Sequence, residues 1–538
     1  MSAWKNIRRS ASTAAIGAAA LAWVALGEPA SAQVTAFKQA MAEAAASSDA
    51  IAQFYRETNY EPIWTGEDDA ERRQALMNAM ALADDHGLPV DRYTPDVLRR
   101  IFSDVTSVRQ RGFAEVEATK LFLSYARDLQ SGILDDPKSI DPGIVRTLPR
   151  RDQVKQLTQL STSDPTLFMR GLIPTTPAYT RLLKTKMALE NVLAEGGWGP
   201  LVRANSLRPG DSSASVIAMR DRLVRMGYLD RTPVANYDSA LEAAVREFQS
   251  DHGLEADGVA GAGTIRQINV EPVERLRSVI VGLERERWLN FEEGLGSRHV
   301  LVNIVDFQTQ LFDDGKVTFE TISVVGRSRV DKQTPEFSDE MEHMVINPTW
   351  FVPRSIATKE YLPNMQANRN ANSYLNFYDA SGRQVSRQSI NFNAYSARTF
   401  PFNMRQPPSD RNALGLVKFM LPNRWNIYLH DSPAKNLFNA DVRAFSAGCV
   451  RLSKPFEFAY TILARQEADP ETFFQTILAT GQETQVDLEE HIPVHITYKT
   501  AVVPAQGRIQ YRPDIYGRDG RLWDALNAAG VSLRAVQS

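Results

Sequence analysis

The sequence predicts a multidomain α+β protein, and two observations support this fold class. First, 538 residues are too many for one domain, because a domain usually holds about 100–200 residues. Second, apolar residues recur every three to four positions up to residue 270, whereas runs rich in Val, Ile, Phe and Thr begin at residue 298. We therefore expect a helical N-terminal scaffold, a small three-helix domain and a mostly-β domain with an inserted cap. Their predicted ranges are 33–200, 205–270 and 298–500, with the cap at about 360–412.

Residues 1–32 have the pattern of an export signal. The pattern comprises a cationic start, an apolar run of 13 residues and a small-residue cleavage site: Lys5, Arg8 and Arg9, then Ala14–Leu26, then Ala30–Ala32. The apolar run is shorter than the roughly 20 residues that span a bilayer. We expect a cleaved signal peptide, with an uncleaved membrane anchor as the alternative.

Residues 33–200 are predicted to be helical. The stretches "LMNAMALADDHGL" and "ATKLFLSYARDLQSGIL" carry apolar residues at helical spacing. The aromatic stretch "FYRETNYEPIWTG", Phe54–Gly66, is interpreted as a cluster that packs helices together. The stretch "SIDPGIVRTLPRRD" is rich in Pro, Gly and charges, so we expect it to run over the surface as a connection.

Residues 205–270 form a compact unit with its own turn signals. A Pro-Gly turn in "LRPGD" precedes a helix whose apolar stripe is Val216, Met219, Leu223 and Met226, and Gly227 ends it. A second helix places Leu241, Val245 and Phe248 on one face, and a short third helix begins at Thr264. The intervening "DGVAGAGT" is not a phosphate-binding loop, because no strand precedes it and no Lys follows it.

Residues 298–500 are rich in strand signals. In "RHVLVNIVDFQTQLFDDGKVTFETISVVG", a "DDG" turn separates two strand-like runs. The insertion at about 360–412 is polar and Asn-rich, so we expect little core content and a mobile flap there. Residues 501–538 predict a short extended segment followed by a terminal helix.

Composition and histidine spacing exclude some functions. The formal net charge of −3 argues against nucleic acid as a partner, because such binding needs a basic excess. His491 and His495 are four residues apart, but "HIPVHITY" alternates like a strand and lacks the HExxH carboxylate, so no zinc site is expected. His343 in "MEHMVINP" is interpreted as a packed or surface residue.

Cys449 is the only cysteine, so it cannot form an intramolecular disulfide. In an exported protein such a thiol is either buried as a small apolar side chain or used in catalysis. A catalytic thiol needs a base beside it, since few free thiols are ionised at neutral pH. His430 is the best-placed base, because it ends the strand-like "NIYLH" just before the turn "DSP".

Several residues around Cys449 in "RAFSAGCVRL" can support catalysis. Gly448 allows backbone to approach a substrate closely, and amides near Cys449 can point at an oxyanion. Ser446 either holds the loop by hydrogen bonds or contacts substrate. Arg451 either pairs with a substrate carboxylate or braces the loop.

These motifs resemble two known families. "LRPGD", "AVREFQ" and "GLEADGVAG" resemble the small three-helix peptidoglycan-binding domain. "IYLHDSP" followed by "RAFSAGCVRL" resembles the active-site signature of the L,D-transpeptidases of the YkuD catalytic fold. Nearly the whole mature chain resembles their long YcbB-like branch of Gram-negative bacteria, also in "FYRETNYEPIW" and "NALGLVKFMLPN". Many family members have a His where this chain has Ala447, so the base role falls on His430 alone.

The resemblance implies a periplasmic enzyme that acts on peptidoglycan stem peptides without a metal or an organic cofactor. Cys449 would attack the diaminopimelate carbonyl of a donor tetrapeptide, release D-alanine and leave a thioester. An acceptor diaminopimelate amine would then form a 3-3 cross-link. The resemblance also implies acylation by carbapenems. Whether residues 205–270 still bind glycan, or only act as a spacer, stays open.

Several alternatives use the same residues differently. Water as acceptor would make the enzyme an L,D-carboxypeptidase, and a protein amine would attach an envelope protein to peptidoglycan. A papain-like endopeptidase is disfavoured because His430 precedes Cys449 in the chain. A non-catalytic wall-binding protein is disfavoured because both residues are present.

Overall fold

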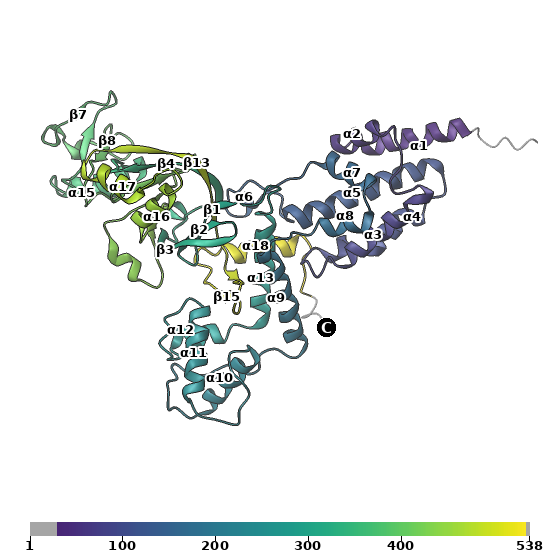
Figure 1. Ribbon diagram of the computed structural model, residues 1–538, viewed down its shortest axis with the longest axis horizontal. Coiled ribbons are helices and arrows are strands. Elements are labelled where there is room, and N and C mark those ends of the chain that lie inside the picture. The colour runs from purple at the N-terminus through teal and green to yellow at the C-terminus, as the bar shows by residue number, and fades with distance from the viewer. Residues whose placement is uncertain (1–29, 534–538) are drawn as a thin grey trace, which may run out of the picture.

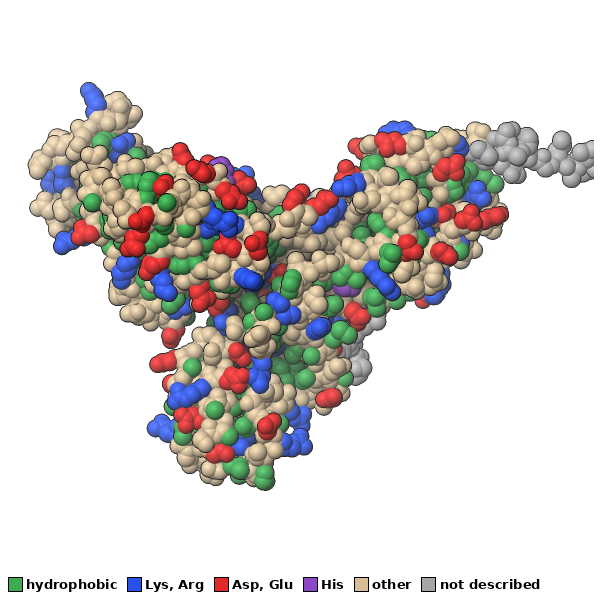
Figure 2. All heavy atoms as spheres, viewed as in Figure 1, with side chains coloured by type: hydrophobic (Ala, Val, Ile, Leu, Met, Phe, Trp, Pro, Cys, Tyr) green, Lys and Arg blue, Asp and Glu red, His purple; other side chains and the backbone are tan. Residues whose placement is uncertain are grey.

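The computed structural model describes residues 30–533, with side chains from residue 35 onward. Figure 1 shows three arms that meet at a central group of helices. The signal peptide expected at residues 1–32 lies outside the described residues, except that Ala30 begins the first helix. Among the helices described, none is both long enough and apolar enough to cross a membrane. On the face drawn in Figure 2, acidic and basic side chains are mixed over all three arms.

The first arm is the helical scaffold. Its helices are α1 (Ala30–Ala45), α2 (Asp49–Glu57), α3 (Ala70–Ala81), α4 (Pro95–Ser103), α5 (Val108–Ser131), α6 (Pro137–Ile140), α7 (Gln153–Thr162), α8 (Pro165–Gly171) and α9 (Pro177–Ala194). Several begin at a side chain that accepts a backbone N–H of the first turn, which satisfies a donor that the helix itself cannot. These caps are Ser48, Ser107, Asp152, Asp164 and Thr176.

The aromatic stretch 54–66 packs inside this arm as predicted. Trp64 is fully buried in the core, and its backbone N–H donates to the Glu115 carboxylate, as do the N–H groups of Ile63 and Thr65. The Tyr55 hydroxyl also donates to Glu115, at 2.9 Å. One buried carboxylate therefore accepts hydrogen bonds from backbone N–H groups that no helix or strand satisfies.

The second arm is a three-helix unit with its own core. It contains α10 (Ala214–Arg225), α11 (Ser239–Asp251) and α12 (Ala262–Ile268). Of the predicted apolar residues, Met226 is partly buried and the others are buried in this core: Val216, Met219, Leu223, Leu241, Val245 and Phe248. Leu207 and Ala260 form an isolated antiparallel β-bridge, which joins the start of the unit to the turn before α12. The periodicity therefore predicted this arm correctly.

At the junction of the arms, α9, the last helix of the first arm, lies beside α13 (Pro272–Arg287) and α18 (Arg518–Ala528) (Figure 1). Apolar residues of α13 and α18, including Leu276 and Leu522, belong to the scaffold core. The C-terminal tail, which also forms the small hairpin of β14 (Ala501–Val502) and β15 (Gln510–Tyr511), thus returns to the first arm.

The connection "SIDPGIVRTLPRRD" does not run over the surface, and that prediction is wrong. Asp141 and Ile144 are buried. The backbone N–H of Val145 donates to the Glu336 carbonyl at 3.0 Å, and Arg146 Nη2 donates to the Ile496 carbonyl at 2.6 Å. The segment is buried because it pairs with residues near positions 336 and 496 of the third arm, a long-range contact that local composition does not encode.

The third arm is built on a nine-stranded sheet. Its strands are β1 (Arg298–Asn303), β2 (Gln308–Asp313), β3 (Lys316–Gly326), β4 (Phe337–Ile346), β9 (Val417–Met420), β10 (Leu429–His430), β11 (Ala444–Ser446), β12 (Val450–Leu452) and β13 (Thr484–Thr497). Their order is β11-β3-β12-β10-β9-β4-β13-β1-β2, and an additional β2–β3 pairing closes the sheet on itself. Helices α16 (Pro455–Leu463) and α17 (Pro470–Ala479) pack beside it.

The inserted cap has more core than its composition predicted. It contains β5 (Trp350–Phe351), β6 (Asn376–Tyr378), β7 (Gln384–Val385) and β8 (Asn403–Gln406), in the order β5-β8-β6-β7, with α14 (Arg354–Ile356) and α15 (Leu362–Ala367). A separate cluster of buried side chains fills it, including Leu362, Phe377, Phe392, Phe400 and Met404. The prediction of little core content is wrong, because widely spaced aromatic residues meet only after the chain folds.

Candidate active site

The predicted base, His430, ends strand β10 of the barrel, and the predicted nucleophile, Cys449, directly precedes the adjacent strand β12. Strands β10 and β12 run parallel, and their register places His430 opposite Arg451. Leu429 and Val450, the preceding pair, are completely buried in the barrel core. Successive side chains on a strand point to opposite faces. His430 and Arg451 therefore point away from the side chains of Leu429 and Val450. The Tyr428 ring lies 5.6 Å from that of His430, and the Cys449 thiol is beside Tyr428 and Arg451.

Cys449 is half-buried just before β12. Its sulfur lies 3.5 Å from the carbonyl oxygen of Asn426. Burial raises the pKa of the thiol to about 11, while the backbone N–H and hydroxyl of Tyr428 and the Arg451 guanidinium act in the opposite direction. The thiol is therefore protonated at neutral pH, and a base must remove its proton when it attacks.

His430 is only 3% exposed. Burial and, to a lesser extent, the Arg451 guanidinium lower the pKa of its imidazole to about 3. The ring is thus neutral at pH 7, which is the form that accepts a proton. Its Nδ1 atom is buried and has no hydrogen-bond partner within residues 35–533. Cys449 lies diagonally across the strand pair from His430, and no hydrogen bond joins them in the described part of the chain.

Ser446 and Gly448 shape the turn that carries the thiol. The Ser446 hydroxyl donates to the Cys449 carbonyl at 2.6 Å and accepts the Gly448 N–H at 3.0 Å. Gly448 has φ +131°, a conformation that other residues rarely adopt. Because Ser446 occupies the Gly448 N–H, that amide is not free for an oxyanion. The next amide, the N–H of Cys449, has no acceptor among the described residues.

Arg451 is a cation without an anionic partner among the described residues. No carboxylate acts on its guanidinium there, and its buried Nε has no hydrogen-bond partner. Burial lowers the pKa of the guanidinium, and the Cys449 thiol is the largest of the influences that raise it. An unpaired guanidinium beside a thiol is suited to bind a carboxylate.

Asp431 fixes the turn that follows His430. One carboxylate oxygen accepts the backbone N–H of Leu416 at 2.9 Å, and the other accepts the N–H of Ser432 and the Lys435 ammonium, each at 2.6 Å. Gly415 has φ +66°, and a Cβ there would overlap the Asp431 carboxylate. Gly415 is therefore required where β9 approaches the end of β10.

Tyr428 is a site residue that the sequence analysis missed. It stands two positions before His430, so the alternation of a strand places it on the same face. Burial raises the pKa of its phenol well above the usual range, and the neighbouring thiol adds to this effect. The phenol therefore stays protonated and can donate a hydrogen bond to the sulfur. The alternation of "IYLH" was the signal that could have identified it.

The cap approaches this face through aromatic residues. The Trp350 and Tyr361 rings meet edge to face, with centroids 6.1 Å apart. Burial raises the pKa of Tyr361, contact with Tyr374 adds to this, and the Arg451 guanidinium opposes it. Tyr361 ends a π-helical turn of the cap (η4, Ala357–Tyr361), so this turn lies within electrostatic reach of Arg451.

The other histidines considered in the sequence lie away from this face. His495 is buried in β13, with Nδ1 2.8 Å from the Ser338 hydroxyl and Nε2 3.0 Å from the Leu295 carbonyl. The half-exposed His491 lies 3.5 Å from Glu340. In residues 35–533 no three His, Cys, Asp or Glu side chains gather as a metal site would need. His343 is a half-buried residue of β4.

Comparison with known families assigns the arms. Residues 297–496 match the YkuD family, described as "L,D-transpeptidase catalytic domain". The chain contains a YkuD-type L,D-transpeptidase catalytic domain. Residues 212–268 of the same protein match a family described as "Putative peptidoglycan binding domain", and residues 49–185 match one described as "Scaffold domain". The two families that the motifs resembled are thereby confirmed.

Individual relatives of this transpeptidase-domain protein are distant. A Haemophilus influenzae protein named "Putative L,D-transpeptidase" is 34% identical over 235 residues, which span 42% of this chain and 47% of that protein. The chain thus matches about half the length of that curated relative. L,D-transpeptidase crystal structures from Stackebrandtia nassauensis and Xylanimonas cellulosilytica are each 13% identical and cover 56% of this chain. The matches cover 97% and 98% of those chains, but TM-scores of 0.21 and 0.17 carry no structural argument.

Proposed function

We propose that this protein is a peptidoglycan L,D-transpeptidase in which Cys449 is the nucleophile and His430 the general base. The observation that carries the proposal is their position on one face of neighbouring strands, inside the segment that matches the transpeptidase domain. The substrates would be stem peptides of peptidoglycan, and the product a 3-3 cross-link between two diaminopimelate residues.

In the first half-reaction the His430 imidazole accepts the proton of Cys449 while the sulfur attacks the diaminopimelate carbonyl. The carbonyl oxygen becomes an oxyanion, for which the N–H of Cys449 is the available donor in the loop. Collapse of this intermediate breaks the C–N bond to D-alanine. The imidazolium returns its proton to the leaving amine, and a thioester remains on Cys449.

In the second half-reaction an acceptor amine attacks the thioester. The imidazole removes a proton from the attacking nitrogen and returns one to the departing sulfur, so the thiol and the neutral ring are restored. If water attacks instead, the product is a tripeptide and the enzyme acts as a carboxypeptidase. A β-lactam carbonyl of the carbapenem type would acylate the same thiol.

Arg451 would bind a carboxylate of the donor stem. Its guanidinium has no anion among the described residues and lies beside both His430 and Cys449. Such a substrate anion would also raise the pKa of the imidazole toward neutrality, because it offsets the cation that lowers it. Substrate binding would thereby make His430 a stronger base.

We also propose a periplasmic location, which the signal-like residues 1–32 support, and attachment to peptidoglycan through the arm that contains α10–α12. Incubating the protein with disaccharide-tetrapeptide and analysing the products by mass spectrometry tests the proposed reaction. A 3-3 dimer supports it, and tripeptide alone reassigns the activity to hydrolysis.

A further inference from the structure

A chain of buried contacts leads from the nucleophile loop to the C-terminal tail. Its first member is Thr334, a fully buried residue on the segment between β3 and β4. The Thr334 hydroxyl donates to the Gly448 carbonyl at 2.7 Å and accepts the N–H of Gly326, the last residue of β3, at 2.8 Å. Thr334 thus ties the loop to the end of a barrel strand.

This contact fixes the direction of one particular amide. The Gly448 carbonyl and the Cys449 N–H belong to the same peptide group, which is planar and trans. Holding the carbonyl on one side therefore directs the N–H to the other side. That N–H is the donor assigned to the oxyanion above, so a rotation of this peptide group would remove it from the site. Gly448, at φ +131°, has no Cβ to oppose such a rotation.

Thr334 is in turn held by residues from outside the catalytic arm. Arg518 Nη2, at the start of α18, donates to the Thr334 carbonyl at 3.0 Å. The Tyr516 hydroxyl donates to the Gly326 carbonyl and lies 3.4 Å from the Thr334 nitrogen. Both residues follow the segment that matches the transpeptidase family, so the tail contributes directly to the loop's support.

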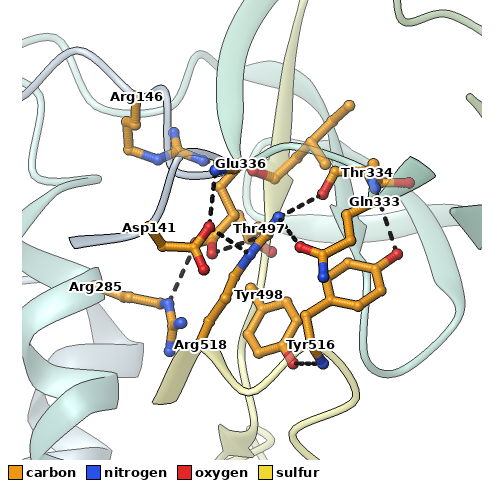
Figure 3. A network of polar contacts seen from close by, with 12 residues as sticks. Asp141, Arg146, Arg285, Gln333, Thr334, Glu336, Thr497, Tyr498, Tyr516 and Arg518 are labelled. Atoms are coloured by element: carbon orange, nitrogen blue, oxygen red, sulfur yellow. Dashed lines mark hydrogen bonds and ion pairs between the residues drawn. The ribbon is translucent and has the colours of Figure 1, made fainter. Parts of the chain in front are cut away.

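Arg518 joins the scaffold connection, the catalytic arm and the central helices at one buried point (Figure 3). Its guanidinium lies 3.2 Å from Glu336 of the catalytic arm and 3.5 Å from Asp141 of the scaffold connection. Glu336 also receives Arg285 of α13 at 3.2 Å. All four side chains are buried, and a planar guanidinium presents five donors in a rigid fork, whereas an ammonium presents only three on a compact head.

We propose that Thr334 is a positioning residue that orients the Cys449 N–H for the oxyanion, and that Arg518 of the C-terminal tail holds Thr334 in place. This inference rests on the proposed transpeptidase function. It predicts that the reaction depends on a hydroxyl which touches neither the thiol nor the substrate, and on a tail that lies outside the catalytic domain in sequence.

The test compares Thr334→Val with Thr334→Ser in the full-length protein. Val keeps the shape and removes both hydrogen bonds, and Ser restores the hydroxyl. Two rates are measured: thioester formation with disaccharide-tetrapeptide, and alkylation of Cys449 by iodoacetamide, which needs no oxyanion donor. We expect Thr334→Val to lower kcat for acylation at least about tenfold with little change in KM, and Ser to recover it to within about threefold. Alkylation should be unchanged in both variants.

Thr309→Val is the matched control. Thr309 is also fully buried in the barrel, but its hydroxyl contacts Ser323, at 2.7 Å, rather than the loop. Thr309→Val should leave the acylation rate, normalised to the amount of Cys449 that iodoacetamide can alkylate, unchanged.

Arg518→Lys should lower the acylation rate, as Thr334→Val does. The Thr334→Val/Arg518→Lys double variant should lose less activity than the product of the two single fold-losses, because both residues act through the same contact. If Thr334→Val does not fold, Thr334→Ala is measured in its place.

The outcomes separate this inference from the proposed function. If the wild-type protein forms no thioester, the transpeptidase proposal fails, and the inference fails with it. If the wild type reacts and Thr334→Val acylates at the wild-type rate, only the inference is overturned. A loss that affects acylation and alkylation equally, or that Ser does not recover, would show a general packing role and would also overturn it.

Discussion

His430 and Arg451 stand directly opposite each other on the parallel strands β10 and β12, so an imidazole and a guanidinium share the face that carries the Cys449 thiol. The cation lowers the pKa of both neighbours, but burial dominates each of them. The resting site therefore holds a neutral thiol and a neutral imidazole rather than an ion pair. This arrangement determines how the site should respond to pH and to substitution.

The first prediction concerns the thiol. With a pKa of about 11, Cys449 should react with iodoacetamide at pH 7 about 100-fold more slowly than an unperturbed thiol, and the rate should rise continuously up to pH 10. Arg451→Ala should slow alkylation further at any pH in this range, because it removes a cation that stabilises the thiolate. Arg451→Lys is the charge-preserving control. A rate that reaches its plateau below pH 8 would show that a thiolate exists in the resting protein.

His430→Gln should separate base catalysis from thiol reactivity. The substitution removes the group that accepts and returns the proton, so acylation by stem peptide should fall about 10²–10⁴-fold. Alkylation of Cys449 at pH 9 should change by less than about threefold, because burial dominates the pKa of the thiol. The acylation and alkylation rates are both measured by quenched time courses on the same protein preparation. Parallel losses of similar size would assign His430 a structural role instead.

Gly415→Ala tests the turn that supports His430. The new Cβ would meet the Asp431 carboxylate in addition to the strain of positive φ. Gly382→Ala is the matched control, because Gly382 has φ +81° with open space around it. We expect Gly382→Ala to cost about 1–2 kcal/mol of unfolding free energy, and Gly415→Ala about 1–3 kcal/mol more. Urea unfolding measures both, and equal losses would refute the contact with Asp431.

Removing the cap should favour water over the acceptor amine. The backbone N–H of Val352 donates to the Met404 carbonyl at 3.0 Å, so a short turn can join these positions and delete residues 353–403. The deletion removes Tyr361 from the neighbourhood of Arg451, and water should reach the thioester more easily. The ratio of tripeptide to dimer should rise several-fold, whereas shortening only the exposed turn 379–383 should leave it unchanged. An unaltered ratio after the full deletion would remove the cap from the reaction.

Local patterns predicted the parts of the fold that local patterns determine. The apolar residues spaced three to four apart in 205–270 predicted the helices correctly, because the buried face of each helix in a three-helix unit repeats with the helical period. Cys449 and His430 could be singled out because one residue is the only thiol and the other ends a strand before a turn. Their spacing alone does not make β10 and β12 neighbours, because β11 lies between them in the chain but pairs with β3.

The remaining parts of the site depend on contacts between distant segments. Thr334 and Arg518 are 184 residues apart, and nothing in the composition near either residue indicates their hydrogen bond. The burial of Asp141 follows from a cation contributed by the far end of the chain. The cap core likewise forms from aromatic residues that are separated by Asn-rich sequence. Such contacts are set by topology, so a single sequence does not reveal them.

The most direct measurement is mass spectrometry of the products that the purified protein makes from disaccharide-tetrapeptide, alongside Cys449→Ala. The proposed function predicts a thioester adduct on the peptide that contains Cys449 and a 3-3 cross-linked dimer, both absent from the variant. A dimer or tripeptide that persists in Cys449→Ala, or folded wild-type protein that forms neither adduct nor product, would contradict it.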